Sequence, residues 1–211
     1  MALRLSLLQR GVAWSKTRRE TWRRMQTAVI ALISVFSGLY ALVAILRHYS
    51  LNSRMYDLAI FDNVFWNSIN GRFFYSDIEG HNYFGEHFNL ILVPFIPLYY
   101  GWSSPTVLLI VQSLALVLGA WPLYLLGRKH RLPDLLNLSL VLGYLLYLPL
   151  FGVNLNDFHE LAFMPLLTLW ALYFLEEERM ALFALFIGLS FLTKENVLLN
   201  GVRFAIVAGV A

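Results

Sequence analysis

Long apolar runs, separated by short polar segments, dominate the chain and predict membrane-spanning helices. The first run extends from Thr27 to Tyr49 and carries no charge before Arg47. We expect further crossings at residues 105–127, 133–151, 163–175 and 180–194. Each run is apolar on every side and lacks a strand or amphipathic-helix period, as a helix surrounded by lipid requires.

Two apolar segments do not fit a full crossing. Residues 89–101 are short and contain Pro94 and Pro97, which favours an interfacial or re-entrant helix. Residues 197–211 end without a polar flank, so we expect a sixth crossing that is cut short and an incomplete C-terminal region. The predicted fold is all-α, a polytopic transmembrane helical bundle of about five spans plus a truncated sixth, with juxtamembrane helices in the first loop.

Composition narrows the class further. Hydrophobic residues make up 59% of the chain and charged residues 14%, whereas soluble domains are about half apolar and a quarter charged. Cysteine is absent, which excludes disulfides and thiolate metal sites. Of the 16 basic residues, seven precede residue 26, so the net charge of +3 indicates contact with anionic lipid headgroups and not with nucleic acid.

The same basic residues set the predicted orientation. By the positive-inside rule, residues 1–26 form a cytoplasmic segment that precedes a single transmembrane domain at 27–211. The loop at 50–104 carries more acidic than basic residues and is expected outside. The polar segments 128–131 and 176–179 are expected inside, which gives a multi-pass protein with a cytoplasmic N-terminus.

This topology gathers ionisable residues on the extracytoplasmic side. The group comprises Asp57, Asp62, His81, Glu86, His87, Asp157, His159, Glu160 and Glu195. Ionisable side chains near membrane depth are costly unless they are paired or hydrated, so each is a functional candidate. The alternative is that outer loops are simply polar.

Residues 56–70 predict an amphipathic helix that lies flat on the outer leaflet. Asp57 and Asp62 flank its apolar stripe, and a carboxylate beside lipid has a raised pKa that suits a general base. The alternative assigns Asp57 to stabilisation of the helix N-terminus and leaves Asp62 in contact with water.

The turn at 154–160 holds three more candidates. Asp157 and Glu160 lie three residues apart and form a helix cap in the simplest interpretation, which leaves His159 unexplained. A metal site would combine His159 with His81, Glu86 and His87. Imidazole and carboxylate suit zinc or manganese, but the spacing matches no standard ligand motif, so we expect neither a metal nor a cofactor.

Lys194 and Glu195 end the last full span that the sequence predicts. In the functional interpretation, Lys194 is a cation at the membrane surface that holds a lipid phosphate. In the alternative, the lysine extends to the interface and pairs with Glu195 or with headgroups.

Five separated motifs occur in order along the chain: YDLAIFDNVFWNSINGRFF, GEHFNLILVPFIPLYY, VQSLALVLGAWPLYLLGRK, NDFHE and TKEN. Together they resemble a large family of prokaryotic membrane proteins known as domain of unknown function 2079. The resemblance covers about residues 30–200 and implies the plasma membrane of a prokaryote as the location.

More distantly, the layout is similar to the GT-C glycosyltransferases, which include protein mannosyltransferases and lipid A aminoarabinose transferases. That resemblance implies a catalytic aspartate early in the first outer loop, matched by Asp57, and a phosphate-contacting cation at Lys194. It also implies that residues 89–101 form the second juxtamembrane helix. The chain departs from the group at Leu58, where a second acidic residue is usual, and at Glu195-Asn196, where Gly-Pro follows the lysine.

The function implied is transfer of a sugar from a polyprenyl-phosphate donor to an acceptor hydroxyl on the extracytoplasmic face. Asp57, or else Asp62, would take the acceptor proton, and Lys194, assisted by His159 or His87, would stabilise the departing phosphate. The other predicted substrate-binding residues are His87, Asp157, His159, Glu160 and Glu195.

Two alternatives to an enzyme stay open. One is a non-catalytic remnant or assembly partner, and the other is a transporter or lipid-handling protein. Transporters tend to show inverted repeats, and no clear repeat is present in this sequence. The expected partners are the lipid bilayer, the lipid-linked donor, and a partner subunit or missing C-terminal region that would complete the site.

Overall fold

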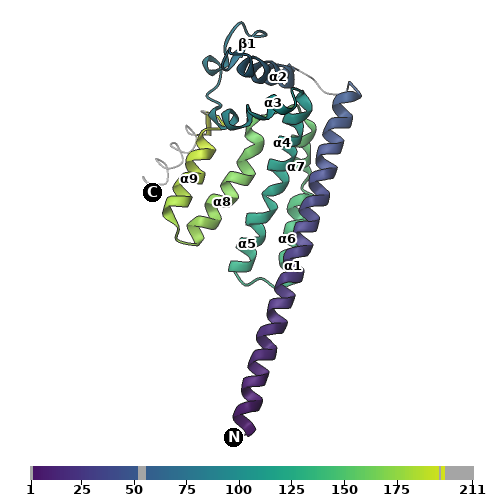
Figure 1. The fold of residues 1–211 in the computed structure, drawn as a ribbon, viewed down its shortest axis with the longest axis vertical. Helices are drawn as coiled ribbons and strands as arrows, with labels where there is room; N and C mark the ends of the chain where they lie inside the picture. The colour runs from purple at the N-terminus through teal and green to yellow at the C-terminus, as the bar shows by residue number, and fades with distance from the viewer. Residues whose placement is uncertain (1, 52–55, 195, 198–211) are drawn as a thin grey trace.

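The structure is a computed structural model that describes residues 2–51, 56–194 and 196–197. A bundle of roughly parallel and antiparallel helices is covered at one end by a further helix, α2, and shorter elements, and α1 projects far beyond the bundle at the other end (Figure 1). The bundle elements are α1 (Ala2–Tyr49), α4 (Pro105–Leu118), α5 (Ala120–Lys129), α6 (Asp134–Leu145), α7 (Leu148–Leu155), α8 (Met164–Glu176) and α9 (Met180–Phe191).

Within the described residues, three helices are long and apolar enough to cross a membrane: Trp22–Tyr49, Pro105–Lys129 and Asp134–Leu155. These agree with the first three predicted spans. The second span consists of α4 and α5, which meet at Gly119. The third consists of α6 and α7, which are separated by two residues, and Pro149 lies in the first turn of α7. The bundle is therefore that of an all-α membrane protein.

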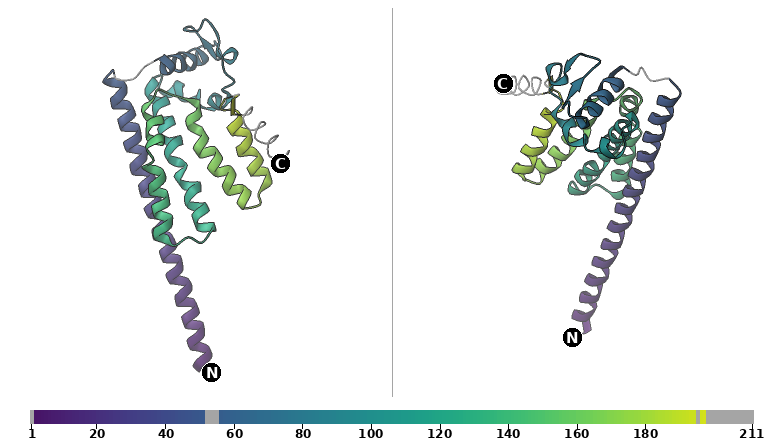
Figure 2. Two further views of the ribbon diagram at one scale, coloured as in Figure 1. Left: turned by 180° about the vertical axis from the view of Figure 1, so that it is seen from behind. Right: turned by 45° about the horizontal axis from the view of Figure 1, so that its top comes forward.

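The fourth and fifth predicted spans correspond to α8 and α9, which pair as a hairpin at the edge of the bundle (Figure 2). They contain 13 and 12 residues, fewer than the roughly 20 that a straight crossing needs. The count of five crossings therefore stays a prediction. The truncated sixth span falls mainly on residues 198–211, outside the described residues.

The loops at 128–131 and 176–179 lie together at the end of the bundle opposite α2 (Figure 1). Lys129 Nζ lies 2.9 Å from Glu177 Oε1, and Arg128 pairs at 2.8 Å with Asp134 at the start of α6. The sequence predicted that these two loops lie on the same side of the membrane, and in the structure they lie at the same end of the bundle. The two ion pairs connect α5 with α6 and with the loop after α8.

The covered end is formed by residues 56–101, here called the cap. It comprises α2 (Tyr56–Ile69), β1 (Tyr75–Ser76), β2 (His81–Asn82), η1 (Tyr83–Gly85), η2 (Leu90–Phe95) and α3 (Leu98–Gly101). The last two form a short apolar helical segment at Leu90–Gly101, where the sequence predicted an interfacial or re-entrant helix, and this segment is not among the three long spans. A backbone hydrogen bond of 3.0 Å from Ile91 N–H to the Leu192 carbonyl fastens this segment to the end of α9.

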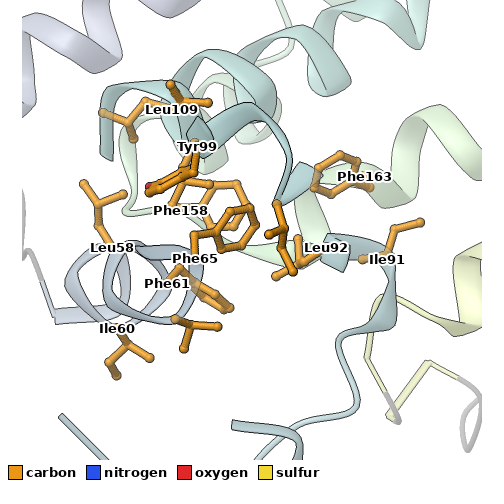
Figure 3. Packing of buried hydrophobic residues seen from close by; sticks show 14 of the residues in the cluster. Leu58, Ile60, Phe61, Phe65, Ile91, Leu92, Tyr99, Leu109, Phe158 and Phe163 are labelled. Atoms are coloured by element: carbon orange, nitrogen blue, oxygen red, sulfur yellow. The ribbon is translucent and has the colours of Figure 1, made fainter. Parts of the chain in front are cut away.

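Helix α2 has the predicted boundaries, but its apolar stripe does not face lipid. Phe61 and Phe65 are at most 2% exposed and pack against rings from other segments (Figure 3). Phe61 meets Tyr83 and Phe158 edge-on at 5.3 and 5.2 Å, and Phe65 lies 5.0 Å from Tyr99. The expectation that this stripe rests on the outer leaflet is wrong, because the protein itself covers it.

Candidate functional site

Asp57 and His159 form the centre of the candidate site. Asp57 lies in the first turn of α2, and His159 lies in the turn between α7 and η3 (Glu160–Phe163). The distance from Asp57 Oδ2 to His159 Nε2 is 3.8 Å, and the two side chains are 47% and 39% exposed. A carboxylate beside an imidazole that solvent can reach is an arrangement suited to proton transfer.

Buried polar residues of α4 hold the His159 turn in place. Gln112 is fully buried, and its Oε1 accepts a hydrogen bond of 2.8 Å from the His159 backbone N–H. The neighbouring Ser113 donates to Asn154 Oδ1 at 2.7 Å, and Asn154 Nδ2 donates to the Tyr40 carbonyl at 2.9 Å. This chain of bonds ties the turn to α4 and α1.

These supporting residues were not among the candidates predicted from the sequence. The signal was available, because Gln112 and Ser113 interrupt an otherwise apolar span at 105–127. Polar side chains inside a membrane helix face the bundle interior and bond to partners there.

Glu160 and Lys194 form a second pair beside His159. Glu160 is buried, with 4% of its side chain exposed, and its Oε1 lies 3.1 Å from Lys194 Nζ. The predicted helix cap is wrong, because η3 begins after His159 without a side-chain cap. Lys194 thus pairs across the fold with Glu160. Its alternative pairing with Glu195 stays a prediction, because Glu195 lies outside the described residues.

Tyr83 feels the charge of one acidic residue from each of these two pairs. Its side chain is 7% exposed, and burial raises the pKa of its phenol, with further contributions from the negative charges of Glu160 and Asp57. The ring also meets His87 edge-on, with 6.3 Å between centroids. His87 therefore belongs to the border of the site through Tyr83.

Asp62 is separated from Asp57 and serves a different contact. Five residues along a helix correspond to a rotation of roughly 140° between them. Tyr99 donates a hydrogen bond of 2.8 Å to Asp62 Oδ1, and burial raises the pKa of the carboxyl. The predicted raised pKa is thus supported for Asp62, but protein causes it in place of lipid.

The proposed four-residue metal set is not brought together. His81 Nε2 lies 3.0 Å from Glu86 Oε1, and Glu79 completes a group whose ligand atoms all lie within 4.8 Å. His159 pairs with Asp57 and does not join this group.

Two hollows follow α1 toward the candidate site. An apolar groove of about 330 Å³ lies between α1, α6 and α7, lined by Phe36, Leu39, Tyr40, Val43, Leu145, Leu146, Leu148 and Phe151. A small cavity of about 10 Å³ has a mixed lining, in which the polar residues include Arg47, His48 and Asp157 and the apolar ones include Ala44 and Leu58. Val43 lines the groove and Ala44 the cavity, so the two hollows are neighbours along α1. Asp157 is 7% exposed.

Comparison with known proteins agrees with the architecture. No curated protein and no solved structure matches the chain. The profile of a family described as "Predicted membrane protein (DUF2079)" matches residues 47–210, which include the cap, the His159 turn and Lys194. The chain therefore belongs to the DUF2079 family of predicted membrane proteins.

Proposed function

We propose that this membrane protein transfers a glycosyl group from a polyprenyl-phosphate donor to an acceptor hydroxyl on the extracytoplasmic face. The observation that carries the proposal is the half-exposed Asp57 carboxylate held 3.8 Å from His159 at the capped end of the bundle. The distant similarity in layout to GT-C glycosyltransferases supports the same assignment.

Asp57 acts as the general base in this proposal. The acceptor oxygen forms a bond to the anomeric carbon while the bond from that carbon to the phosphate oxygen breaks. The acceptor proton passes to Asp57, and the electron pair of the broken bond leaves with the lipid phosphate. His159 keeps the Asp57 carboxylate oriented. The backbone of His159 is itself fixed by the hydrogen bond to Gln112.

Lys194 supplies positive charge for the departing phosphate. Its ammonium group has three N–H donors, and Glu160 takes one of them in the 3.1 Å pair. The side chain is 23% exposed, so the other donors can reach a phosphate oxygen. Charge fixed in advance where negative charge develops is an effective form of transition-state stabilisation.

The apolar groove along α1 supports a lipid-linked donor. Its lining is almost entirely hydrocarbon and aromatic, and it lies at the depth of the spans Trp22–Tyr49 and Asp134–Leu155. A polyprenyl chain in this groove would place its phosphate end toward the cavity beside Arg47 and Asp157, next to the candidate site.

The test is a rate measurement with purified chain in lipid and a panel of polyprenyl-phosphate sugars. We expect glycosyl transfer or donor hydrolysis by the wild type and a rate about 10²- to 10⁴-fold lower in Asp57→Asn. A larger loss in Asp62→Asn than in Asp57→Asn would contradict the assignment of the base. Folded protein that turns over no donor would contradict the enzyme and favour a non-catalytic assembly partner.

A further inference from the structure

The cap carries a second cluster of ligating side chains, distinct from the Asp57–His159 pair. Glu79 precedes the Gly80 turn, His81 opens β2, and Glu86 follows η1. One oxygen or nitrogen atom from each residue lies within 4.8 Å of the others. The cluster brings together the two ends of a short loop, residues 79–86.

The hydrogen bond at Nδ1 of His81 determines whether Nε2 carries a proton or a lone pair. Nδ1 lies 3.0 Å from the Asn82 carbonyl oxygen, which only accepts, so Nδ1 carries the proton. In a neutral ring, Nε2 then presents a bare lone pair to Glu86 Oε1 at 3.0 Å. Two acceptors at this distance repel each other, so the cluster calls for a cation between them, either a proton or a metal ion.

We propose that Glu79, His81 and Glu86 bind a divalent transition-metal ion, zinc in the first place. Imidazole nitrogen and carboxylate oxygen are both zinc ligands, and the cluster offers one of the first and two of the second. A tetrahedral ion bound at about 2.0 Å holds its ligand atoms about 3.3 Å apart, close to the separation of His81 and Glu86. The exposure of these two side chains, 44% and 48%, leaves the ion a route in and a fourth position for water.

The surroundings orient the ligands as a metal site requires. The Asn82 carbonyl fixes the His81 tautomer, and the Tyr56 hydroxyl donates to Glu79 Oε1 at 2.9 Å. Hydrogen bonds of this kind to ligand residues typically affect metal affinity by tenfold or more. The Tyr56 bond also connects the cluster to the first residue of α2.

The ion would close the 79–86 loop around Tyr83 and hold it against α2. Tyr83 packs edge-on against Phe61 at 5.3 Å, and Tyr56 directly precedes Asp57 in the sequence. The metal is thus structural, a brace for the side of the cap that borders the candidate site. It takes no part in the proposed transfer reaction, so the proposal stands apart from that function.

The test is zinc binding by the full chain in detergent, purified with an affinity tag that lacks histidine and stripped with chelator. Isothermal titration calorimetry with zinc chloride should give one ion per chain, and zinc should raise Tm. His81→Ala and Glu86→Gln should bind at least about tenfold more weakly. The matched control is His130→Ala, which breaks the His130–Glu176 pair of 3.7 Å at the opposite end of the bundle and should bind like the wild type.

Circular dichroism and gel filtration establish that each variant is folded. If a ligand variant fails to fold, Tyr56→Phe removes the hydrogen bond to Glu79 without removing a ligand, and it should still weaken zinc binding. Wild type without stoichiometric zinc, or His81→Ala and Tyr56→Phe with wild-type affinity, would overturn the proposal and leave a proton as the cation.

Discussion

Gln112 shows how one buried amide determines the position of a candidate catalytic residue. It is fully buried in α4 and is the acceptor for the His159 backbone N–H at 2.8 Å. Because a buried donor without a partner is costly, Gln112→Leu should lower the free energy of unfolding by about 1–3 kcal/mol. Chemical denaturation in detergent measures this change, with Gln26→Leu on α1 as the control. Equal effects of the two substitutions would contradict the role of Gln112.

Asp62 and Asp77 should respond to pH in opposite directions. Burial raises the pKa of Asp62, so the folded state binds its proton more tightly and stability falls as the pH rises above about 3.9. Hydrogen bonds from Asn67 and Arg72 lower the pKa of Asp77, so its contribution is present above about pH 3.9 and is lost as the pH falls through its folded pKa.

Chemical denaturation across a range of pH tests these opposite effects of Asp62 and Asp77 on the free energy of unfolding. Asp62→Asn should flatten the decline of stability above about pH 3.9, and Asp77→Asn should lower stability at pH 7 and not below its folded pKa. A loss of stability at pH 7 as large in Asp62→Asn as in Asp77→Asn would contradict the sign given for Asp62.

At the scale of elements, α2 organises the cap through its buried face. Phe61 contacts both the ring of Tyr83 and that of Phe158, which directly precedes His159. Phe61→Ala should therefore cost about 3–5 kcal/mol in the free energy of unfolding. Trp66 lies on the same helix but is 51% exposed. Trp66→Ala should therefore cost much less free energy of unfolding in the same measurement. A reversed order would mean that lipid and not protein covers the Phe61 face.

The sequence was a reliable guide to elements and a poor one to their partners. Apolar runs predicted the first three spans, and helical spacing predicted the limits of α2, since both depend on local pattern. The same spacing cannot distinguish a stripe facing lipid from one facing protein, so Phe61 was placed wrongly. Asp57 with His159 and Glu160 with Lys194 are long-range pairs that arise only when α2 and α9 pack on the bundle, and no local pattern encodes them.

At the scale of the whole molecule, orientation decides where any chemistry happens. The chain has no native cysteine, so single cysteines report accessibility without background. We expect Asn82→Cys in the cap to react with a membrane-impermeant maleimide on intact cells, and Glu178→Cys at the other end to react only after lysis. The reverse pattern would place the cap in the cytoplasm and exclude an extracytoplasmic reaction.

Asp57 and His159 are expected to act on substrate as one unit. The most direct measurement is kcat/KM for wild type, Asp57→Asn, His159→Gln and the double variant with the same polyprenyl-phosphate donor. Residues that act as a unit are strongly non-additive, so the double variant should be no slower than the slower single variant. Losses that multiply across the two positions, or wild-type turnover in Asp57→Asn, would contradict a joint role of Asp57 and His159.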